Sequence, residues 1–267
     1  MRRPIRQSKI VATLGPKSSS KDIIEKLIEA GTDVFRLNTS HGKPADHIKR
    51  AQLVRSIAEK NNRNVAILLD LQGPKIRIEK FIKNEILLTD NQRFTLDADC
   101  DPEGGDEHRV AIAYRDLATQ ISKGKRLLLD DGKIILEVLE INGVSIVCEV
   151  ITGGSLGSRK GINIEGGGLK AEAFTEDDRN ILIDLYNKGV DFDYVALSFV
   201  NSAQDLHDLS QFLKQQSIQT SIIAKIETRI GLQNLAEIAA AADAVMIARG
   251  DLGVEIGDER LPAAQKQ

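Results

Sequence analysis

The chain has 267 residues, a net charge of −3, 42% hydrophobic and 28% charged residues, which is the make-up of an ordinary soluble globular protein with one large or two modest domains. The slightly acidic balance and the absence of Trp argue against a nucleic-acid binder or an anionic-membrane binder. Cys100 and Cys148 cannot form a disulfide framework, and no apolar run reaches transmembrane length. We therefore expect a cytoplasmic protein without nucleic-acid or membrane partners.

Short apolar runs alternate with amphipathic stretches in the first part of the chain. This pattern predicts strands at 10–14, 34–38 and 65–70, and helices at 20–30 and 44–60. Continuous apolar strands between helices are typical of a parallel sheet covered on both faces.

The rhythm changes from about 74 to 168, where no clear long helix is predicted. Alternating runs of strand type, separated by Gly and Asp turns, lie at 85–88, 93–96, 126–129, 133–138 and 144–147. We interpret this segment as a small all-β insert, with Gly166-Gly167-Gly168 as a hinge.

The alternation of strands and helices resumes after the insert. It predicts helices at 175–188, 203–215 and 231–242, and strands at 194–200, 221–227 and 244–249. Six such units without a dinucleotide-binding fingerprint favour a (β/α)8 barrel, of which about six of the eight strands are present. The predicted fold class is therefore α/β, an incomplete barrel with an inserted all-β lid. The predicted domains are 1–73 (barrel, first part), 74–168 (lid) and 169–267 (barrel, second part).

Ionised side chains follow the predicted strands at the end where parallel α/β folds gather their functional groups. They include Arg36, Asp70, Lys225, Glu227 and Asp251. Neighbouring strands lie about 4.8 Å apart, so Glu227 and Asp251 can reach one cation, and two carboxylates with open positions suit Mg²⁺. A lysine and an arginine beside such a cation are the groups that phosphoryl transfer requires.

Each of these signals also has a simpler explanation. A lone Lys-x-Glu on a strand is usually a half-exposed salt pair, and a strand-end Arg or Asp is commonly a loop anchor. Asp130-Asp131-Gly132 between two strands is usually a turn. The combination of four ionised strand ends in register favours a functional site.

Motifs along the whole chain are shared with one known family. They lie at 9–18, 36–42, 73–77, 130–132, 160–163, 224–227 and 248–255. On these motifs, in this order, the chain resembles pyruvate kinase. It departs from the family pattern at Thr39, where Phe is usual, and at Ile230, where an acidic residue is usual.

The resemblance implies phosphoryl transfer from phosphoenolpyruvate to ADP, giving pyruvate and ATP in glycolysis, with Mg²⁺ or Mn²⁺. It implies catalytic roles for Lys225 and Arg36 and a metal site at Glu227 and Asp251. The substrate-binding residues that it implies are Arg36, Lys225, Gly250, Asp251 and Ser198. The nucleotide-side residues that it implies are Asn38, His41, Arg77, Lys160 and Asp131. The insert is implied to be a lid that excludes water during transfer.

One departure concerns a monovalent-cation pocket, whose residues here are Asn38, Ser40 and Asp70. Many family members have Thr and Glu where this chain has Leu71 and Lys75. A tethered ammonium can replace K⁺ electrostatically, so we expect Lys75 to act as the cation surrogate and K⁺ not to be required.

The resemblance also implies two further barrel strands, a substrate-binding Thr and a C-terminal domain that this chain does not contain. We expect the complete enzyme to be a homotetramer and this chain alone to turn over little or nothing. Two alternatives stay open: a non-catalytic fragment that binds metal or nucleotide, and a Mg²⁺-dependent barrel lyase or aldolase acting on pyruvate-type enolates. A lyase needs no ADP site, so Arg77 and Lys160 argue against it.

Overall fold

A computed structural model describes residues 7–74, 76–166 and 171–267. Lys75, predicted as a cation surrogate, and Gly167 and Gly168, predicted as part of a hinge, lie outside the described residues. The chain divides into two compact units. The first contains 1–73, 172–225 and 235–246, and the second contains 74–171, 226–234 and 247–267.

A six-stranded sheet in the order β1-β2-β3-β12-β13-β14 organises the α/β part of the chain. Its strands are β1 (Val11–Thr13), β2 (Val34–Asn38), β3 (Ala66–Asp70), β12 (Tyr194–Leu197), β13 (Ser221–Ile226) and β14 (Ala244–Ile247). The neighbours from β1 to β13 pair in parallel. Most side chains of β3 are buried, as the continuous apolar run of this strand predicts.

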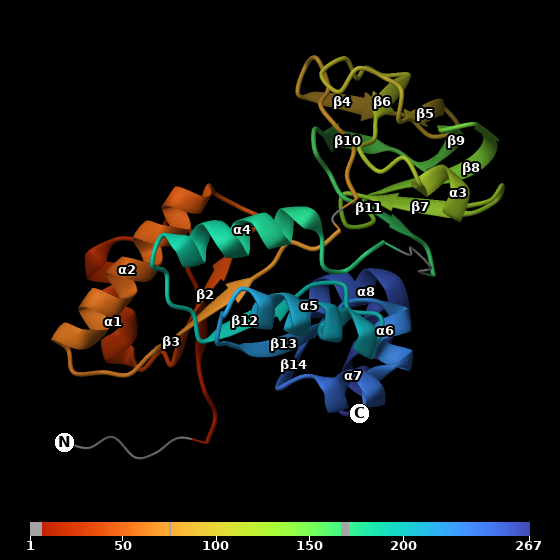
Figure 1. Cartoon of the computed structure of the whole chain (residues 1–267). Helices are drawn as coiled ribbons and strands as arrows, with labels where there is room; N and C mark the ends of the chain where they lie inside the picture. The colour runs from red at the N-terminus through yellow and green to blue at the C-terminus, as the bar shows by residue number, and fades with distance from the viewer. Residues whose placement is uncertain (1–6, 75, 167–170) are drawn as a thin grey trace. The chain divides into compact units, whose positions relative to one another are not determined.

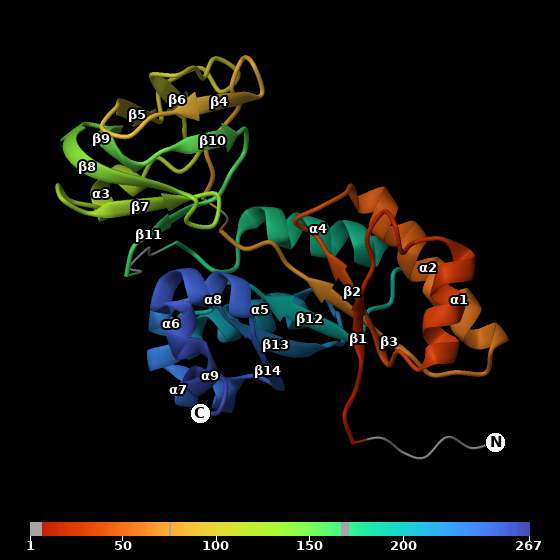
Figure 2. The same ribbon diagram turned by 180° about the vertical axis from the view of Figure 1, so that it is seen from behind.

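Helices follow the strands of the first unit in the alternation that the sequence predicts. They are α1 (Lys21–Ala30), α2 (Pro44–Lys60), α4 (Glu176–Asn187), α5 (Ala203–Gln215) and α7 (Leu235–Ala241). Ile24 and Ile28, one turn apart on α1, are fully buried, and α1 lies beside α2 in both views (Figures 1 and 2). Gly31 ends α1 in the left-handed conformation, with φ +105°. The predicted α/β class and incomplete barrel are confirmed.

Among the described residues between 74 and 166, the regular structure is mostly strand, with one short helix. The strands form a six-stranded sheet in the order β11-β7-β8-β9-β5-β6 and a two-stranded sheet of β10 and β4. The elements are β4 (Glu85–Leu88), β5 (Arg93–Asp97), β6 (Arg109–Ala111), α3 (Leu117–Gln120), β7 (Arg126–Leu129), β8 (Ile134–Asn142), β9 (Ser145–Thr152), β10 (Gly154–Gly157) and β11 (Ile162–Ile164). Phe94, Leu136 and Cys148 are fully buried in their core, and burial raises the pKa of the Cys148 thiol to about 12.

Several predicted boundaries are wrong by one to three residues. The sequence predicts strands through Val200, Glu227 and Arg249, whereas β12 ends at Leu197, β13 at Ile226 and β14 at Ile247. The helix predicted at 231–242 is divided into two helices, at 229–233 and 235–241. The difference at β14 has a local cause: the carbonyl of Ala248 accepts a hydrogen bond from Leu252 N–H at 3.0 Å, which starts a helix. The remaining elements of the second unit are α6 (Arg229–Gln233), α8 (Arg249–Ile256), the 3₁₀ turn η1 (Asp258–Arg260) and α9 (Leu261–Ala264).

No helix among the described residues combines the length and the apolar character that a membrane span requires.

Candidate active site

A buried carboxylate lies at the carboxyl end of the parallel sheet and holds two cations. Asp70, the last residue of β3, is 1% exposed. The Arg36 guanidinium on the neighbouring strand β2 donates from Nε to Asp70 Oδ2 at 2.5 Å, and its Nη2 also pairs with that oxygen. Lys225 Nζ, from β13, lies 3.1 Å from Asp70 Oδ1. One carboxylate therefore pairs with two cations that are far apart in the sequence.

The Lys225 ammonium has a second buried partner. Its Nζ donates to Ser198 Oγ at 2.7 Å, and Ser198 Oγ donates to the Leu71 carbonyl at 2.7 Å. Lys225 is 7% exposed and Ser198 is 2% exposed. The sequence proposes Ser198 as a substrate-binding residue on resemblance alone, and in the structure its hydroxyl orients Lys225.

Strand alternation explains why Arg36 reaches this cluster. Its neighbours Phe35 and Leu37 are fully buried on the other face of β2, and Arg36 Nη1 donates to Thr13 Oγ1 on β1 at 3.0 Å. The main chain at Asp70 is fixed as well, because both the N–H and the hydroxyl of Thr39 donate to its carbonyl at 3.0 Å.

The residues of the predicted monovalent-cation pocket lie at the same ends of β2 and β3. Asn38 is in register with Asp70, and Asn38 Oδ1 accepts from the Ser40 N–H at 3.0 Å. The pairing of Asp70 with Arg36 and Lys225, which sequence reasoning missed, means that this carboxylate already faces two positive charges.

Two acidic residues of the second unit have the chemistry of a divalent-cation site. Glu227 follows β13 directly and is 1% exposed, and Asp251 is half-buried in the first turn of α8. In the described parts of the chain, no group of three or more His, Cys, Asp or Glu side chains could hold a metal ion. Mg²⁺ takes one or two carboxylates and fills its other positions with water and substrate oxygens, so a two-carboxylate donor set fits it.

The position of Asp251 differs from the sequence prediction. It lies in the first turn of a helix, with Gly250, and does not end a strand. The first N–H groups of a helix have no intrahelical acceptor and carry the positive end of the helix dipole. The backbone at Gly250 and Asp251 can therefore donate to an anion such as a substrate carboxylate.

A partly buried contact fixes the other end of α8. Glu255 Oε2 accepts from the Arg229 N–H at 2.8 Å, and Arg229 Nη2 donates to the Glu255 carbonyl at 3.2 Å. Burial raises the pKa of the Glu255 carboxyl, and the contact with Arg229 offsets part of this rise. The contact ties α8 to α6, the helix that follows Glu227.

The predicted nucleotide-side cations of the second unit are brought together by backbone pairing. Arg77 forms an antiparallel bridge with Gly161, and the Ile78 N–H donates to the Lys160 carbonyl at 3.0 Å. Arg77 Nε is buried and has no hydrogen-bond partner among the described residues. Burial, with Arg159 nearby, lowers the pKa of the Arg77 guanidinium. An anion bound here would balance the charges of the Arg77 and Arg159 guanidinium groups and would accept a hydrogen bond from Arg77 Nε.

Asp130 is an acidic partner in this region that sequence reasoning missed. Its carboxylate pairs with Lys160 at 2.7 Å and with Lys133 at 3.0 Å. Asp130, Asp131 and Gly132 all have positive φ, which is unusual for non-glycine residues. The turn expected at this position is present, and it places the carboxylate against Lys160 while the Asp131 side chain stays exposed.

We expect Asp130→Asn to flatten the acid limb of the stability profile. The hydrogen bond from Lys160, aided by Lys133, lowers the pKa of Asp130. A carboxyl whose pKa is lower in the folded state stabilises the fold above the unfolded value of about 3.9 and loses this contribution as the pH falls through the folded value. Thermal unfolding midpoints of wild type and variant should therefore differ most near neutral pH and converge as the pH falls below the lowered pKa that Asp130 has in the folded state.

Asp131→Asn is the matched control for this experiment, because Asn also tolerates a left-handed conformation and the Asp131 side chain is exposed. A constant difference between Asp130→Asn and wild type from acid to neutral pH would contradict the interpretation.

Asn38 and His41 follow β2 in the first unit. Asn38 is half-buried and caps Ser40, whereas His41 is exposed. Their predicted contact with a nucleotide stays a prediction.

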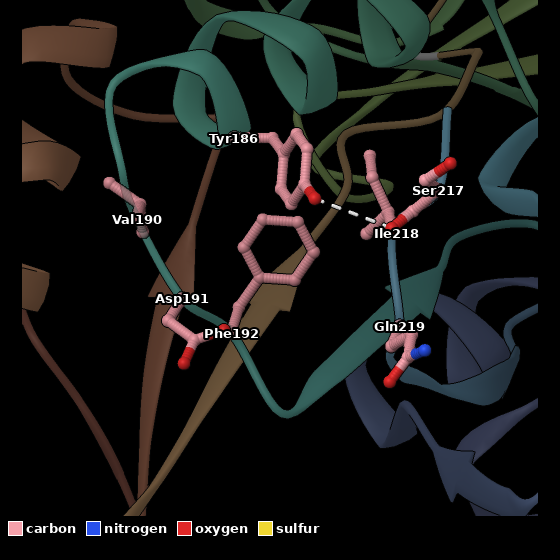
Figure 3. A pocket seen from close by; sticks show the side chains of 7 residues that line it. All are labelled: Tyr186, Val190, Asp191, Phe192, Ser217, Ile218 and Gln219. Atoms are coloured by element: carbon pink, nitrogen blue, oxygen red, sulfur yellow. Dashed lines mark hydrogen bonds between the residues drawn. The ribbon is translucent and has the colours of Figure 1, made fainter.

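A pocket of about 310 Å³ lies at the opposite end of the strands, where β12 and β13 begin (Figure 3). Tyr186 and Phe192 line it from the α4–β12 side, and Ser217 and Ile218 line it from the α5–β13 side. The Tyr186 hydroxyl donates to the Ser217 carbonyl at 3.3 Å. Catalytic groups of α/β barrels lie at the carboxyl ends of the strands, so this pocket is not the candidate active site.

Comparison with known proteins gives independent evidence on the family of this chain. Residues 5–267 match the family model "Pyruvate kinase, barrel domain". The chain is 44% identical to a pyruvate kinase of Haemophilus influenzae over 270 residues, 45% identical to pyruvate kinase II of Salmonella typhimurium over 269, and 43% identical to a pyruvate kinase of Thermococcus litoralis over 267. Each alignment covers 100% of this chain but only 55–56% of the relative, so the chain spans a little more than half the length of these curated relatives.

Proposed function

This chain belongs to the pyruvate kinase family, and from that premise we propose that it carries out Mg²⁺- or Mn²⁺-dependent phosphoryl transfer from phosphoenolpyruvate to ADP, giving pyruvate and ATP. The observation that carries the proposal is the buried Lys225 ammonium, held by Asp70 and Ser198. Glu227, a buried carboxylate, follows two residues later in the chain. As a step of glycolysis, the reaction belongs in the cytoplasm.

Lys225 and Arg36, both in the first unit, each have a chemical task in this reaction. The ammonium of Lys225 stabilises the charge of the transferring phosphoryl group and of the enolate that remains. The Arg36 guanidinium, already oriented by Asp70, offers a planar fork to phosphate oxygens. Preorganised cations at low exposure lower the barrier more than mobile surface cations do, because they need not reorient during the reaction.

Glu227 and Asp251 are the residues that would hold the divalent cation. When bound, the ion supplies charge neutralisation and a fixed attachment for substrate oxygens. The backbone N–H groups at Gly250 and Asp251 would bind the substrate carboxylate at the start of α8.

On the nucleotide side we propose contacts from Arg77, Lys160 and Asp131, with Asn38 and His41. Backbone pairing brings the segments that carry Arg77 and Lys160 side by side, and two cations on adjacent segments support a phosphate-binding role. We propose that the insert at 74–168, between barrel segments 1–73 and 169–267, acts as a lid that excludes water. We also propose that the complete enzyme is a homotetramer.

We propose that this activity does not require K⁺. Asp70, the acidic member of the cation pocket, is paired with Arg36 and Lys225, and Leu71 offers no oxygen ligand from its side chain. Lys75 is the proposed surrogate, although its place lies outside the described residues. Initial rates with K⁺ replaced by tetramethylammonium test this: equal rates are expected, and a collapse that K⁺ reverses would contradict it.

The decisive experiment combines a coupled assay of pyruvate and ATP formation with calorimetric titration of Mg²⁺ and phosphoenolpyruvate. Turnover that needs both ADP and Mg²⁺ supports the proposed function. Binding without turnover supports a chain that holds metal or nucleotide without catalysis. Conversion of pyruvate-type enolates without ADP supports a lyase. If the chain shows no binding and no turnover, the proposal is overturned.

A further inference from the structure

A buried aspartate of the first unit gathers four hydrogen-bond donors from two distant segments. Asp178, in the first turn of α4, is 1% exposed. Its Oδ1 accepts from the N–H groups of Gln72 at 3.1 Å and Gly73 at 3.3 Å. Its Oδ2 accepts from the Thr175 N–H at 3.1 Å and the Thr175 hydroxyl at 2.7 Å. The start of α4 is thereby fastened to the loop after β3.

The same loop is fastened from its other side to the candidate catalytic lysine. The Leu71 carbonyl accepts from Ser198 Oγ at 2.7 Å, and Ser198 Oγ accepts from Lys225 Nζ at 2.7 Å. Lys225 then reaches Asp70 Oδ1, at 3.1 Å, which precedes Leu71 in the chain. Buried hydrogen bonds thus run from Asp178 through the main chain at 71–73 to the Lys225 ammonium.

Close packing keeps this loop from adjusting freely. Gly73 has φ +64°, and a Cβ placed on it would lie 3.0 Å from Ser198 Cβ and 3.2 Å from Phe199 Cδ2. Phe199 itself has φ +57°, a conformation that costs energy in a bulky residue and persists only where its surroundings hold it. The backbone at Gly73 therefore lies directly against Ser198, which is a hydrogen-bond partner of Lys225.

We propose that Asp178 is a positioning residue for Lys225. It holds the loop at 71–73 so that the Leu71 carbonyl orients the Ser198 hydroxyl, which in turn holds the ammonium against Asp70. Gly73 is also the last residue of the first unit before the chain continues into the second. The position of Lys225 therefore depends on the conformation of this connection, and the consequence for catalysis rests on the function proposed above.

Asp178→Asn tests the proposal with little change in volume. The amide keeps one oxygen but presents an N–H₂ group where donors of Thr175 or of the loop converge, so one pair of hydrogen bonds is lost. Asp177→Asn, an exposed neighbour on the same turn, is the matched control.

Two readouts that need no turnover are measured on wild type and variants. Amide hydrogen exchange at Gln72 and Gly73 should accelerate at least about tenfold in Asp178→Asn. Reductive methylation of Lys225, followed by peptide mass spectrometry against the exposed Lys188, should accelerate roughly threefold or more as its amine is released from Ser198. The control variant should match wild type in both measurements.

Faster exchange at Gln72 and Gly73 with unchanged Lys225 methylation would overturn the proposal, because Asp178 would then be structural only. Ser198→Ala breaks the connection further along and should release Lys225 while exchange at Gln72 stays slow. If Asp178→Asn does not fold, Ser198→Ala alone tests the proposal. Lys225 methylation as slow as in wild type would then overturn it. Since neither readout uses phosphoenolpyruvate or ADP, an absent kinase activity would leave this result standing, and a failed result here would leave the kinase proposal standing.

Discussion

Replacing Asp70 with asparagine is expected to lower the free energy of unfolding by about 3–5 kcal/mol. The carboxylate is 1% exposed and pairs with both Arg36 and Lys225. The asparagine amide is neutral, so Lys225, whose side chain is 9% exposed, loses its carboxylate counter-ion in a site that water hardly reaches. The cost of an unbalanced buried charge exceeds the net value of the original pair, and for this reason the expected loss is large.

Urea unfolding followed by circular dichroism measures this loss. Asp22→Asn, an exposed aspartate in the first turn of α1, is the control and should change stability by less than about 1 kcal/mol. In the double variant Asp70→Asn/Lys225→Met, the cost of losing Asp70 should be smaller than in the wild-type background, because the stranded ammonium is gone. A loss below about 1 kcal/mol for Asp70→Asn alone would show that the buried charges are not held as described.

The sequence predicts the α/β part well where burial leaves a local signal. A parallel strand covered on both faces is a continuous apolar run, and β2 and β3 were predicted within one residue of their observed bounds. The insert is harder. β10 contains two glycines in four residues and exists because it pairs with β4, some 70 residues earlier. β6 and β11, with three residues each, are too short for any periodicity to show.

In the candidate site, too, the sequence predicts what depends on a local pattern and misses what depends on contacts between distant segments. Sequence position predicts that Arg36, Asp70 and Lys225 lie at the carboxyl edge of one parallel sheet, and the structure places them there on β2, β3 and β13, with β12 between the last two. Their pairing through one carboxylate was not predicted, since Asp70 was assigned to a cation pocket with Asn38 and Ser40. The contact of Asp178 with Gln72 spans 106 residues and joins a helix start to a loop. Such contacts depend on tertiary packing, and no local sequence pattern predicts them.

Replacing Lys225 with methionine is expected to reduce phosphoryl transfer from phosphoenolpyruvate to ADP by at least about 10³-fold, roughly 4 kcal/mol of transition-state stabilisation. The side chain keeps a similar length and loses only its charge, at a point where Asp70 and Ser198 otherwise fix that charge in place. Arginine should not restore activity, because its planar fork cannot occupy the site of a compact ammonium between a carboxylate and a hydroxyl.

Initial rates on the full gene product, with kcat and KM separated, measure this effect. Lys188→Met, at an exposed lysine, is the control and should keep wild-type rates. Calorimetry distinguishes the possible roles of the lysine. If Lys225 acts mainly on the developing charge, kcat falls while phosphoenolpyruvate still binds with Mg²⁺, because Glu227 and Asp251 remain. A variant that keeps kcat within about tenfold of wild type would remove Lys225 from the reaction and leave its buried ammonium with a structural role only.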